Sequence, residues 1–419
     1  MSEKTSKISG FYKQPVEKRN EIVKKFADLT DDEARLFSSS LDIEIADRMI
    51  ENVLGNFELP IGIAVNFKIN GEDKLVPMAI EESSVVAAAS NAAKIARIKG
   101  GFTAECSDPI MIGQIQLLEV NDVVSAAEEI INHKKQLLNL ANAQDKVLVN
   151  LGGGAKDLEV RILNSPLGKM IVTHIHVDVR DAMGANAVNT MCEALAPMLE
   201  ELTGGRTRLK ILSNLADKRI ARAKAVFDKE KIGGEKVVDA FLESYTLASI
   251  DPYRAATHNK GIMNGIDALI IATGNDFRAI EAGAHAYAAR DGNYTSLSKY
   301  YKDKDGNLVG EIEIPVAVGI VGGASNIHPK AKLCKKILGI KTASDLGKIV
   351  ASLGLAQNFA AVYALSTVGI QKGHMRLHAK NIAVMAGAEG KEIDKVADKM
   401  VKEEKVKIDR AKEILEEIR

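Results

Sequence analysis

The stretch LEVRILNSPLGKMIVTHIHVDV, residues 158–179, consists of two apolar runs separated by a turn. Leu158–Leu163 and Met170–Val179 favour β-strands, because valine, isoleucine and threonine are enriched in strands. Asn164–Gly168 contains serine, proline and glycine, which are typical of turns. The stretch therefore predicts a β-hairpin.

The segments that flank this hairpin complete a β-α-β-β-α-β series. Ile110–Val120 favours a strand and Asp122–Gln144 a helix, whereas Asn186–Leu202 favours a helix and Thr207–Leu212 a final strand. This order is that of the split βαβ, or ferredoxin-like, domain. We expect such a domain at residues 109–213.

The remaining chain predicts a larger, mostly helical domain, so the expected fold class is α+β. Residues 1–108 and 214–368 form its two parts, and residues 369–419 form a helical tail. The elements expected in these parts are a helix at Asp42–Leu54, a hairpin of Ile61–Ile69 and Leu75–Ile80, a helix at Asp217–Lys231, a buried strand at Ala268–Ala272, a hairpin of Ser296–Lys302 and Leu308–Val318, and a charged helix at Glu392–Ile418.

The composition is that of a globular protein with balanced charge. Of 419 residues, 46% are hydrophobic and 27% are charged, and 56 basic residues balance 56 acidic ones. A net charge of zero argues against nucleic acid as the main partner. The longest continuous apolar stretch in this reading, Ile314–Gly323, is about half of the ~20 residues that a bilayer span needs, so we expect no membrane segment.

The cysteines indicate a reducing environment. Cys106, Cys192 and Cys334 are far apart and odd in number, which argues against a disulfide framework and favours small buried side chains. Residues 1–13 lack the apolar core of a signal peptide. We expect a cytoplasmic protein.

Common nucleotide and zinc-protease motifs are absent. Gly152–Gly154 is followed by Asp157 where a Rossmann fingerprint needs glycine, and this run favours a turn before a strand. No Walker A loop occurs. His374 and His378 have the spacing of a zinc-protease pair but lack its glutamate. A dinucleotide would therefore bind without the Rossmann fingerprint.

One further group of residues could hold a metal in principle. His174, His176 and Asp178 share one face of the second hairpin strand. The alternate residues are mostly apolar and indicate that the histidine face is the hydrated one. We therefore expect no metal.

Four clusters combine polar residues with small apolar ones and could carry chemistry. They are Glu81–Ser84 at the junction of a strand and a helix, Asp251–Asp267, Thr273–Asp276 after the expected buried strand, and Gly373–Met375. The second cluster, DPYRAATHNKGIMNGID, resembles a substrate-binding loop because its glycines would let a ligand approach the backbone. Each cluster alone also has a purely structural explanation, such as a carboxylate at a helix N-terminus.

Taken together, the clusters resemble a known family. With ENVLG at Glu51–Gly55 and DAMGAN at Asp181–Asn186, they occur in the order found in the 3-hydroxy-3-methylglutaryl-coenzyme A (HMG-CoA) reductases. The chain is similar to the soluble second class of this family over nearly its whole length. The resemblance implies reduction of HMG-CoA through mevaldehyde to mevalonate, with two reduced nicotinamides consumed and CoA released. One departure is Ser83, where this class often has proline.

The resemblance also implies catalytic roles for four residues. Lys260 would stabilise the developing oxyanion, and Glu82 would donate a proton at the aldehyde step. Asp276 would join both in one hydrogen-bonded network. His374 would protonate the departing CoA thiolate.

Binding residues follow from the same resemblance. Ser84, Arg254 and Asn264 would hold the HMG moiety. NADH would be favoured over NADPH by the acidic residue Asp145, although the adjacent Lys146 could turn towards the extra phosphate of NADPH. The residues of the DAMGAN segment that would meet the cofactor are Asp181, Met183, Gly184 and Asn186.

The family likeness further implies a homodimer, or a hexamer built as a trimer of dimers, with the active site at the dimer interface. ENVLG would lie in that interface, and the tail after Gly369 would close over the site as a flap. An acyltransferase is disfavoured because no cysteine falls in the four clusters. A non-catalytic nucleotide-binding protein and an enzyme that oxidises mevalonate remain the alternatives.

Overall fold

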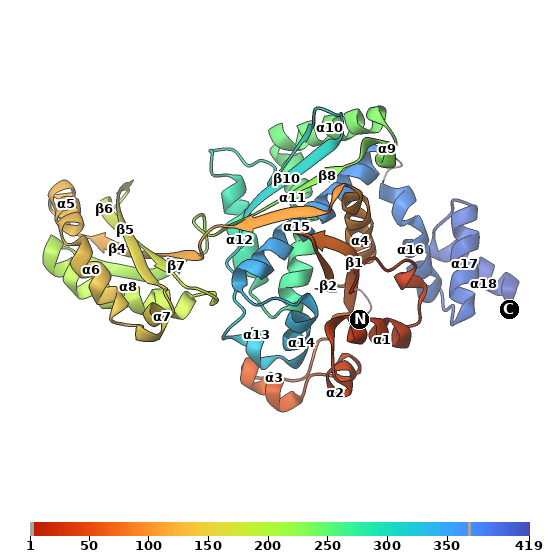
Figure 1. The fold of residues 1–419 in the computed structure, drawn as a ribbon, viewed down its shortest axis with the longest axis horizontal. Helices are drawn as coiled ribbons and strands as arrows, with labels where there is room; N and C mark the ends of the chain where they lie inside the picture. The colour runs from red at the N-terminus through yellow and green to blue at the C-terminus, as the bar shows by residue number, and fades with distance from the viewer. Residues whose placement is uncertain (1–3, 368–369) are drawn as a thin grey trace.

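The computed structural model of the chain describes residues 4–367 and 370–419, apart from the side chains of residues 324 and 370–377. A small unit, a central unit and a C-terminal group of helices follow one another along the longest dimension of the molecule (Figure 1). Strands and helices are both abundant and the sheets are almost entirely antiparallel, which confirms the α+β class.

The small unit is a four-stranded antiparallel sheet in the order β5-β6-β4-β7, with helices α5, α6 and α8 packed against one face. The chain passes through its elements in the predicted β-α-β-β-α-β order, except that the first helix is divided near His133 and is followed by the short helix α7. The elements are β4 (Ile110–Leu118), α5 (Val123–Asn132), α6 (Lys134–Asn142), α7 (Lys146–Asn150), β5 (Gly154–Ser165), β6 (Gly168–Asp178), α8 (Ala185–Thr203) and β7 (Arg206–Ser213).

The two faces of this small sheet differ because side chains alternate along each strand. Ile175 and Val177 of β6 are fully buried in the main hydrophobic core, beside Cys192 of α8. Gly113 of β4 lies so close to α8 that a Cβ atom there would be 2.4 Å from Sγ of Cys192. The opposite face carries His174 and the other even-numbered residues of β6.

The central unit contains a six-stranded sheet in the order β2-β1-β3-β8-β10-β9. Strand β3 ends at Cys106, β8 begins at Ile220, and these two strands pair antiparallel. The small unit is thus inserted between two neighbouring strands of one sheet. The strands are β1 (Ile61–Ile69), β2 (Glu72–Ala79), β3 (Phe102–Cys106), β8 (Ile220–Phe227), β9 (Ser298–Lys302) and β10 (Leu308–Pro315).

Helix α15 (Ala343–Ser366) lies in the middle of the central unit and packs against α4, α11, β3 and β8. It is long and apolar enough to cross a membrane, so Ile314–Gly323 is not the longest apolar segment. However, 67% of its apolar window is buried inside the protein. Packing within the core accounts for its composition.

The remaining helices surround the central sheet or form the C-terminal group. The C-terminal helices have their own core, which includes Val396, Met400 and Ile414. The helices of the central unit are α1 (Val16–Ala27), α2 (Asp31–Arg35), α3 (Ile43–Met49), α4 (Val85–Ala96), α9 (Lys229–Ile232), α10 (Glu235–Ile250), α11 (Pro252–Ala272), α12 (Phe277–Ala288), α13 (Ala324–Ile327) and α14 (Pro329–Leu338). The C-terminal helices are α16 (Ile370–Met385), α17 (Lys391–Lys402) and α18 (Ile408–Ile418).

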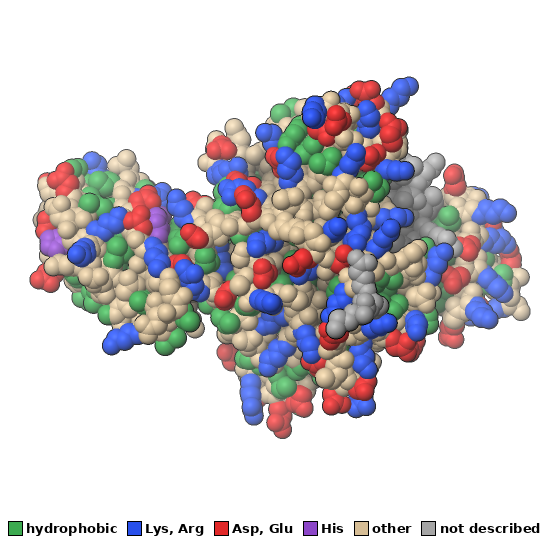
Figure 2. All heavy atoms as spheres, in the orientation of Figure 1, with side chains coloured by type: hydrophobic (Ala, Val, Ile, Leu, Met, Phe, Trp, Pro, Cys, Tyr) green, Lys and Arg blue, Asp and Glu red, His purple; other side chains and the backbone are tan. Residues whose placement is uncertain are grey.

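Charged side chains of both signs are interspersed over the face of the molecule seen in Figure 2. This distribution agrees with the zero net charge. The three cysteines are free, and Cys192 and Cys334 are buried, as the sequence predicts.

The expected helix at Asp217–Lys231 is wrong. Residues 220–227 form strand β8, which pairs with both β3 and β10. Its alanines favour a helix by intrinsic propensity, but Ala221, Ala223 and Ala225 are buried while Arg222 and Lys224 are exposed. Pairing on two sides therefore outweighs local propensity.

The expected strand at Ala268–Ala272 is also wrong, because this segment is the end of helix α11. A short buried apolar run cannot be distinguished from a buried helix by its pattern alone. For the same reason the expected loop at Asp251–Asp267 is the beginning and middle of α11.

Two expected helices have different bounds. The one expected at Asp42–Leu54 is shorter, because α3 ends at Met49 and residues 53–60 have no regular structure. The one expected at Glu392–Ile418 is divided into α17 and α18, which pack against each other.

Candidate active site

Two candidate catalytic residues of the central unit are in contact. Nζ of Lys260 lies 3.3 Å from Oε2 of Glu82. Lys260 comes from α11, and Glu82 from the short turn between β2 and α4. The two side chains are 63% and 44% exposed, so substrate can reach them from solvent.

Helix α11 fixes the position of Lys260. Its N-terminus is capped by Asp251, whose carboxylate accepts a hydrogen bond from N–H of Arg254 at 2.8 Å, and Pro252 stands at the first helical position. Along its length α11 packs closely against α15, since a Cβ on Gly265 would come within 3.0 Å of Gln357. The helix is therefore a rigid support.

Two polar residues of α11 next to Lys260 anchor the helix. Nε2 of His258 is 2.7 Å from Oγ of Ser298, and the pKa of His258 is lowered to about 3 by burial and by the charge of Arg254. The side chain of Asn259 donates to O of Thr295 and accepts from N–H of Leu297. These contacts explain part of the polar cluster without assigning a role in catalysis.

Asn264 follows Lys260 by one helical turn, so the two residues share a face of α11. Asn264 is half-buried. Arg254 is also half-buried, and its guanidinium makes no hydrogen bond or ion pair with the residues whose side chains are described. Arg254 thus has donors available for an anionic ligand.

Ser84 lies at the start of α4, two residues after Glu82. It occupies the left-handed region with φ of 76°, which is uncommon for a residue other than glycine. This conformation turns the chain sharply from the end of β2 into α4, and the turn exposes Glu82.

Asp276 is placed differently from its expected network. It caps α12, accepting from N–H of Arg278 at 3.0 Å and N–H of Ala279 at 3.2 Å. Its other oxygen pairs with the Arg278 guanidinium at 2.9 Å. Among the described residues, the hydrogen-bond and ion-pair partners of Asp276 in this conformation do not include Lys260 or Glu82.

His374 is the fourth candidate catalytic residue. His374 belongs to α16, but its side chain lies outside the described residues. Of the four candidate catalytic residues, the structure therefore brings Lys260 and Glu82 together.

The DAMGAN segment joins the small unit to the central unit. Oδ1 of Asp181 accepts from N–H of Ala343 at the start of α15, at 2.7 Å, and O of Asp181 accepts from N–H of Ile320 at 2.9 Å. Gly184 has φ of 99° and caps α8, and a Cβ there would meet Val179 at 2.4 Å. Only glycine fits this junction.

Met183 and Asn186 complete the segment. Met183 is half-buried beside Gly319, where a Cβ would come within 2.6 Å of N of Met183. Asn186 is exposed in the first turn of α8, where backbone N–H groups favour an anion.

Arg219 supports this segment and was not singled out in the sequence. It is 5% exposed, and it donates to O of Ala182 at 3.1 Å and to O of Val318. Burial lowers its pKa to about 10. A lone arginine before a strand gives no sequence signal, because its partners are carbonyl groups from distant segments.

Asp145 was expected at the end of the first helix of the small domain. It lies after α6 and caps the next helix, α7, accepting from N–H of Leu148 at 2.8 Å. Lys146 is the exposed first residue of α7. The two side chains that could decide cofactor choice therefore stand at one helix N-terminus.

Comparison with known proteins is consistent across sequence and structure. A family model described as "Hydroxymethylglutaryl-coenzyme A reductase" matches residues 15–379. The chain is 58% identical over 416 residues to the 3-hydroxy-3-methylglutaryl-coenzyme A reductase of Archaeoglobus fulgidus, covering 99% of this chain and 95% of that protein. It is 38% identical over 380 residues to the probable reductase of Borreliella burgdorferi, covering 88% and 85%.

Two solved structures from Streptococcus pneumoniae resemble the chain closely. One HMG-CoA reductase has a TM-score of 0.84 at 42% identity, covering 98% of this chain and 99% of that one. The other is described as a class II reductase bound to NADPH in open conformations, with a TM-score of 0.82 at 42% identity, covering 97% and 100%.

Proposed function

The chain belongs to the hydroxymethylglutaryl-coenzyme A reductase family, and we propose that it reduces (S)-HMG-CoA to (R)-mevalonate and free CoA for isoprenoid synthesis. The observation that carries this proposal is the 3.3 Å contact between Nζ of Lys260 and Oε2 of Glu82. It places a cation and a carboxyl group together at a solvent-accessible point. Both are needed where a carbonyl oxygen first gains negative charge and then a proton.

The reaction transfers four electrons in two steps, with mevaldehyde between them. A bound reduced nicotinamide supplies a hydride in each step. The ammonium group of Lys260 stabilises the negative charge on the carbonyl oxygen, and Glu82 provides the proton at the aldehyde step. We assign protonation of the departing CoA thiolate to His374, which prevents the thiolate from adding back to the aldehyde.

Asp276 joins this pair in the proposed mechanism. Its ion pair with Arg278 is largely exposed, with Arg278 71% and Asp276 41% accessible. Exposed ion pairs contribute only about 0–1 kcal/mol, so substrate binding has enough energy to separate them. Asp276 then exchanges Arg278 for the Lys260–Glu82 pair.

HMG is positioned by side chains from both ends of the site. The free donors of Arg254 suit the terminal carboxylate, because a guanidinium binds a carboxylate through two parallel hydrogen bonds. Asn264, one turn from Lys260, lies where it can bond near the reacting carbonyl, and Ser84 borders Glu82.

The DAMGAN segment would hold the cofactor, because the backbone N–H groups in the first turn of α8 suit an anionic group. Asp145 favours NADH, because its carboxylate would repel the additional phosphate of NADPH. The Streptococcus relative was solved with NADPH. In this chain, the ammonium group of Lys146 could bind the additional phosphate of NADPH. NADPH is therefore the alternative cofactor.

The enzyme acts as a homodimer or as a hexamer of three dimers. The segment after α3 exposes large apolar side chains, and Leu54 and Phe57 are more than 90% exposed. An exposed group of this kind is typical of an interaction surface. The helices α16 to α18 would close as a flap over the exposed Lys260 and bring His374 to the thiolate.

Two other properties belong to the same proposal. The free cysteines suit a reducing compartment, and we place the enzyme in the cytoplasm. The same site could oxidise mevalonate, because every step is reversible in chemical terms, and this direction is the alternative function.

The test is the initial rate of loss of nicotinamide absorbance, measured with NADH and with NADPH. We expect the folded enzyme to oxidise the nicotinamide only when HMG-CoA is present, and to release CoA as a product. No oxidation with either cofactor would reject the reductase and favour a non-catalytic binding protein. The ratio of kcat/KM values for the two cofactors decides the choice between them.

A further inference from the structure

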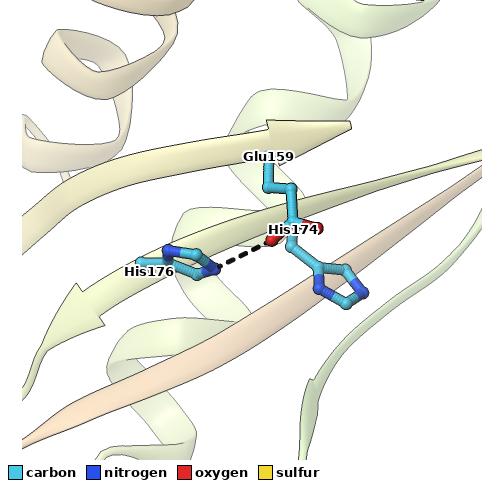
Figure 3. A group of neighbouring side chains, drawn as sticks. All are labelled: Glu159, His174 and His176. Carbon is cyan, nitrogen blue, oxygen red and sulfur yellow. Dashed lines mark ion pairs between the residues drawn. The ribbon is translucent and has the colours of Figure 1, made fainter. Parts of the chain in front are cut away.

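The helix-free face of the small sheet gathers two histidines and a glutamate. His174 and His176 alternate with buried Ile175 along β6, and Glu159 of β5 stands directly beside His174 in the strand register. One possible ligand atom of each residue lies within 4.8 Å of the other two. In Figure 3 the carboxylate of Glu159 lies between the two imidazole rings.

One atom of this group is unsatisfied. Nε2 of His176 is buried and makes no hydrogen bond within the described part of the chain. Oε2 of Glu159 is the nearest charged acceptor, at 3.8 Å, which is too far for a hydrogen bond. A buried polar atom without a partner costs about 1–3 kcal/mol, so its position calls for a ligand.

The other nitrogen of each ring has a polar group near it. Nδ1 of His176 lies 3.9 Å from Oδ2 of Asp157, beyond hydrogen-bond distance, and Nε2 of His174 lies 2.9 Å from Nε2 of the Gln114 amide. Metal-binding histidines usually donate their second N–H to a carboxylate or carbonyl oxygen, so both side chains would have to adjust slightly to support the rings. Rotation of the Gln114 amide by half a turn would present its oxygen to His174.

We propose that Glu159, His174 and His176 bind a zinc ion on the open face of the small sheet, with water as the fourth ligand. His176 binds through Nε2 and His174 through Nδ1. Two histidines and one carboxylate with an open position are an established zinc ligand set. The ion ties β5 to β6 and has no part in hydride transfer.

The three ligand atoms lie within 4.8 Å of one another and must move closer together to bind zinc. Tetrahedral bonds of ~2.0–2.1 Å place ligand atoms ~3.4 Å apart, so the 3.8 Å separation between His176 and Glu159 must shrink by about 0.4 Å. Glu159 is half exposed and can move by this amount. Asp178 is not a ligand, because it is buried and forms an ion pair with Arg180.

The charges nearby select the type of metal. Lys134 pairs with Asp157, and Arg161 lies 3.4 Å from Nε2 of His174. Because Nε2 carries the ring proton when Nδ1 binds zinc, the exposed Arg161 side chain would turn away from it. Glu159 pairs with no lysine or arginine among the described residues, and its ion-pair partner there is His176. A hard cation such as Ca²⁺ would require more oxygen ligands, whereas imidazole suits zinc.

The test measures zinc affinity in untagged, chelator-treated protein by competition with a chromogenic zinc indicator. The variants are His174→Asn, His176→Asn and Glu159→Gln, with His133→Asn on the helical side of the same unit as the matched control. We expect one zinc per chain in the wild type and in the control, and at least tenfold weaker binding in each of the other three. Cobalt should give tetrahedral visible absorption that His176→Asn abolishes.

Thermal unfolding separates loss of the site from loss of the fold. Zinc should raise the melting temperature of the wild type and of His133→Asn but not of His176→Asn, since a ligand stabilises only the form that binds it. Glu159→Gln, at a half-exposed position, should melt without zinc at the wild-type temperature. No stoichiometric zinc in the wild type, or equal affinity in all variants, would overturn the proposal.

Discussion

Nζ of Lys260 and Oε2 of Glu82 lie 3.3 Å apart although the two residues are separated by 178 positions in the chain. In the proposed mechanism Lys260 stabilises the charge that develops in the transition state. Lys260→Ala should therefore lower kcat with HMG-CoA at least 100-fold. Glu82→Gln should lower it comparably while keeping the shape of the side chain. Lys304→Ala, in an exposed turn, is the control and should retain full activity. Unchanged turnover in Lys260→Ala would reject the catalytic assignment.

Asp276 has two separable tasks, capping α12 and completing the proposed network. Asparagine caps helices about as well as aspartate, so Asp276→Asn should melt near the wild-type temperature. It should nevertheless lose most of kcat, because the negative charge is gone. Arg278→Ala removes the present ion partner of Asp276 and should leave kcat within about threefold. Equal losses in both variants would show that the ion pair itself matters.

Asp145 can be tested for cofactor choice without disturbing its cap. Asp145→Asn keeps the hydrogen bond to N–H of Leu148 and removes the charge that opposes the NADPH phosphate. We expect the ratio of kcat/KM for NADPH to that for NADH to rise about tenfold, which corresponds to ~1.4 kcal/mol. Asp122→Asn alters the N-cap of α5 in the same unit and is the control. A ratio unaffected by Asp145→Asn would assign this residue to capping alone.

The pair of Asp73 and Arg97 predicts how stability changes in acid. Burial would raise the pKa of Asp73, but hydrogen bonds from Arg97 and Ser6 lower it to about 2, below the ordinary 3.8. Because the folded-state pKa is depressed, the stabilisation is complete above pH ~4 and is lost as pH falls towards 2. Asp73→Asn should lower the free energy of unfolding by up to about 2 kcal/mol at pH 7.

Denaturant unfolding between pH 3 and 7 measures this effect. The difference between wild type and Asp73→Asn should narrow as pH falls below 4. Asp28→Asn, which breaks an exposed ion pair with Lys4, should show a difference under 1 kcal/mol throughout. A constant difference at every pH would mean that hydrogen bonding, not charge, holds the hairpin to α4.

The sequence predicted the small unit well because its signals are local. The turn at Asn164–Gly168 and the alternation along Met170–Val179 need no distant partner to be recognised. Strand β8 was missed because what makes it a strand is pairing with β3 and β10, each far away in the sequence. Helix α11 was divided into a loop and a strand because its packing against α15, for example at Gly265, is a contact that no local pattern reveals.

The sequence indicated candidate site residues but not the contacts that their side chains make. Family likeness indicated Lys260 and Glu82, and the structure gives their distance. It could not indicate that Asp276 pairs with Arg278, since that depends on the side-chain conformation of the unliganded site. The support by Arg219 was equally hidden, because its partners are backbone carbonyl groups.

The exposed apolar segment after α3 predicts a dimer that can be broken at one position. Phe57 is 91% exposed and follows the fully exposed Leu54. If this segment is buried between two chains, Phe57→Asp places a charge in an apolar interface and should convert the dimer to monomers. Leu167→Asp, at an equally exposed tip between β5 and β6, is the matched control and should remain dimeric. Light scattering coupled to gel filtration measures the masses.

Activity should fall with the dimer. When the site is completed by the partner chain, monomeric Phe57→Asp should lose at least 100-fold in kcat/KM while its circular dichroism stays that of the wild type. Its activity should also rise with protein concentration, because mass action restores the dimer. A monomeric variant with full activity would place the whole site within one chain, and a variant that stays dimeric would move the interface away from residues 50–60.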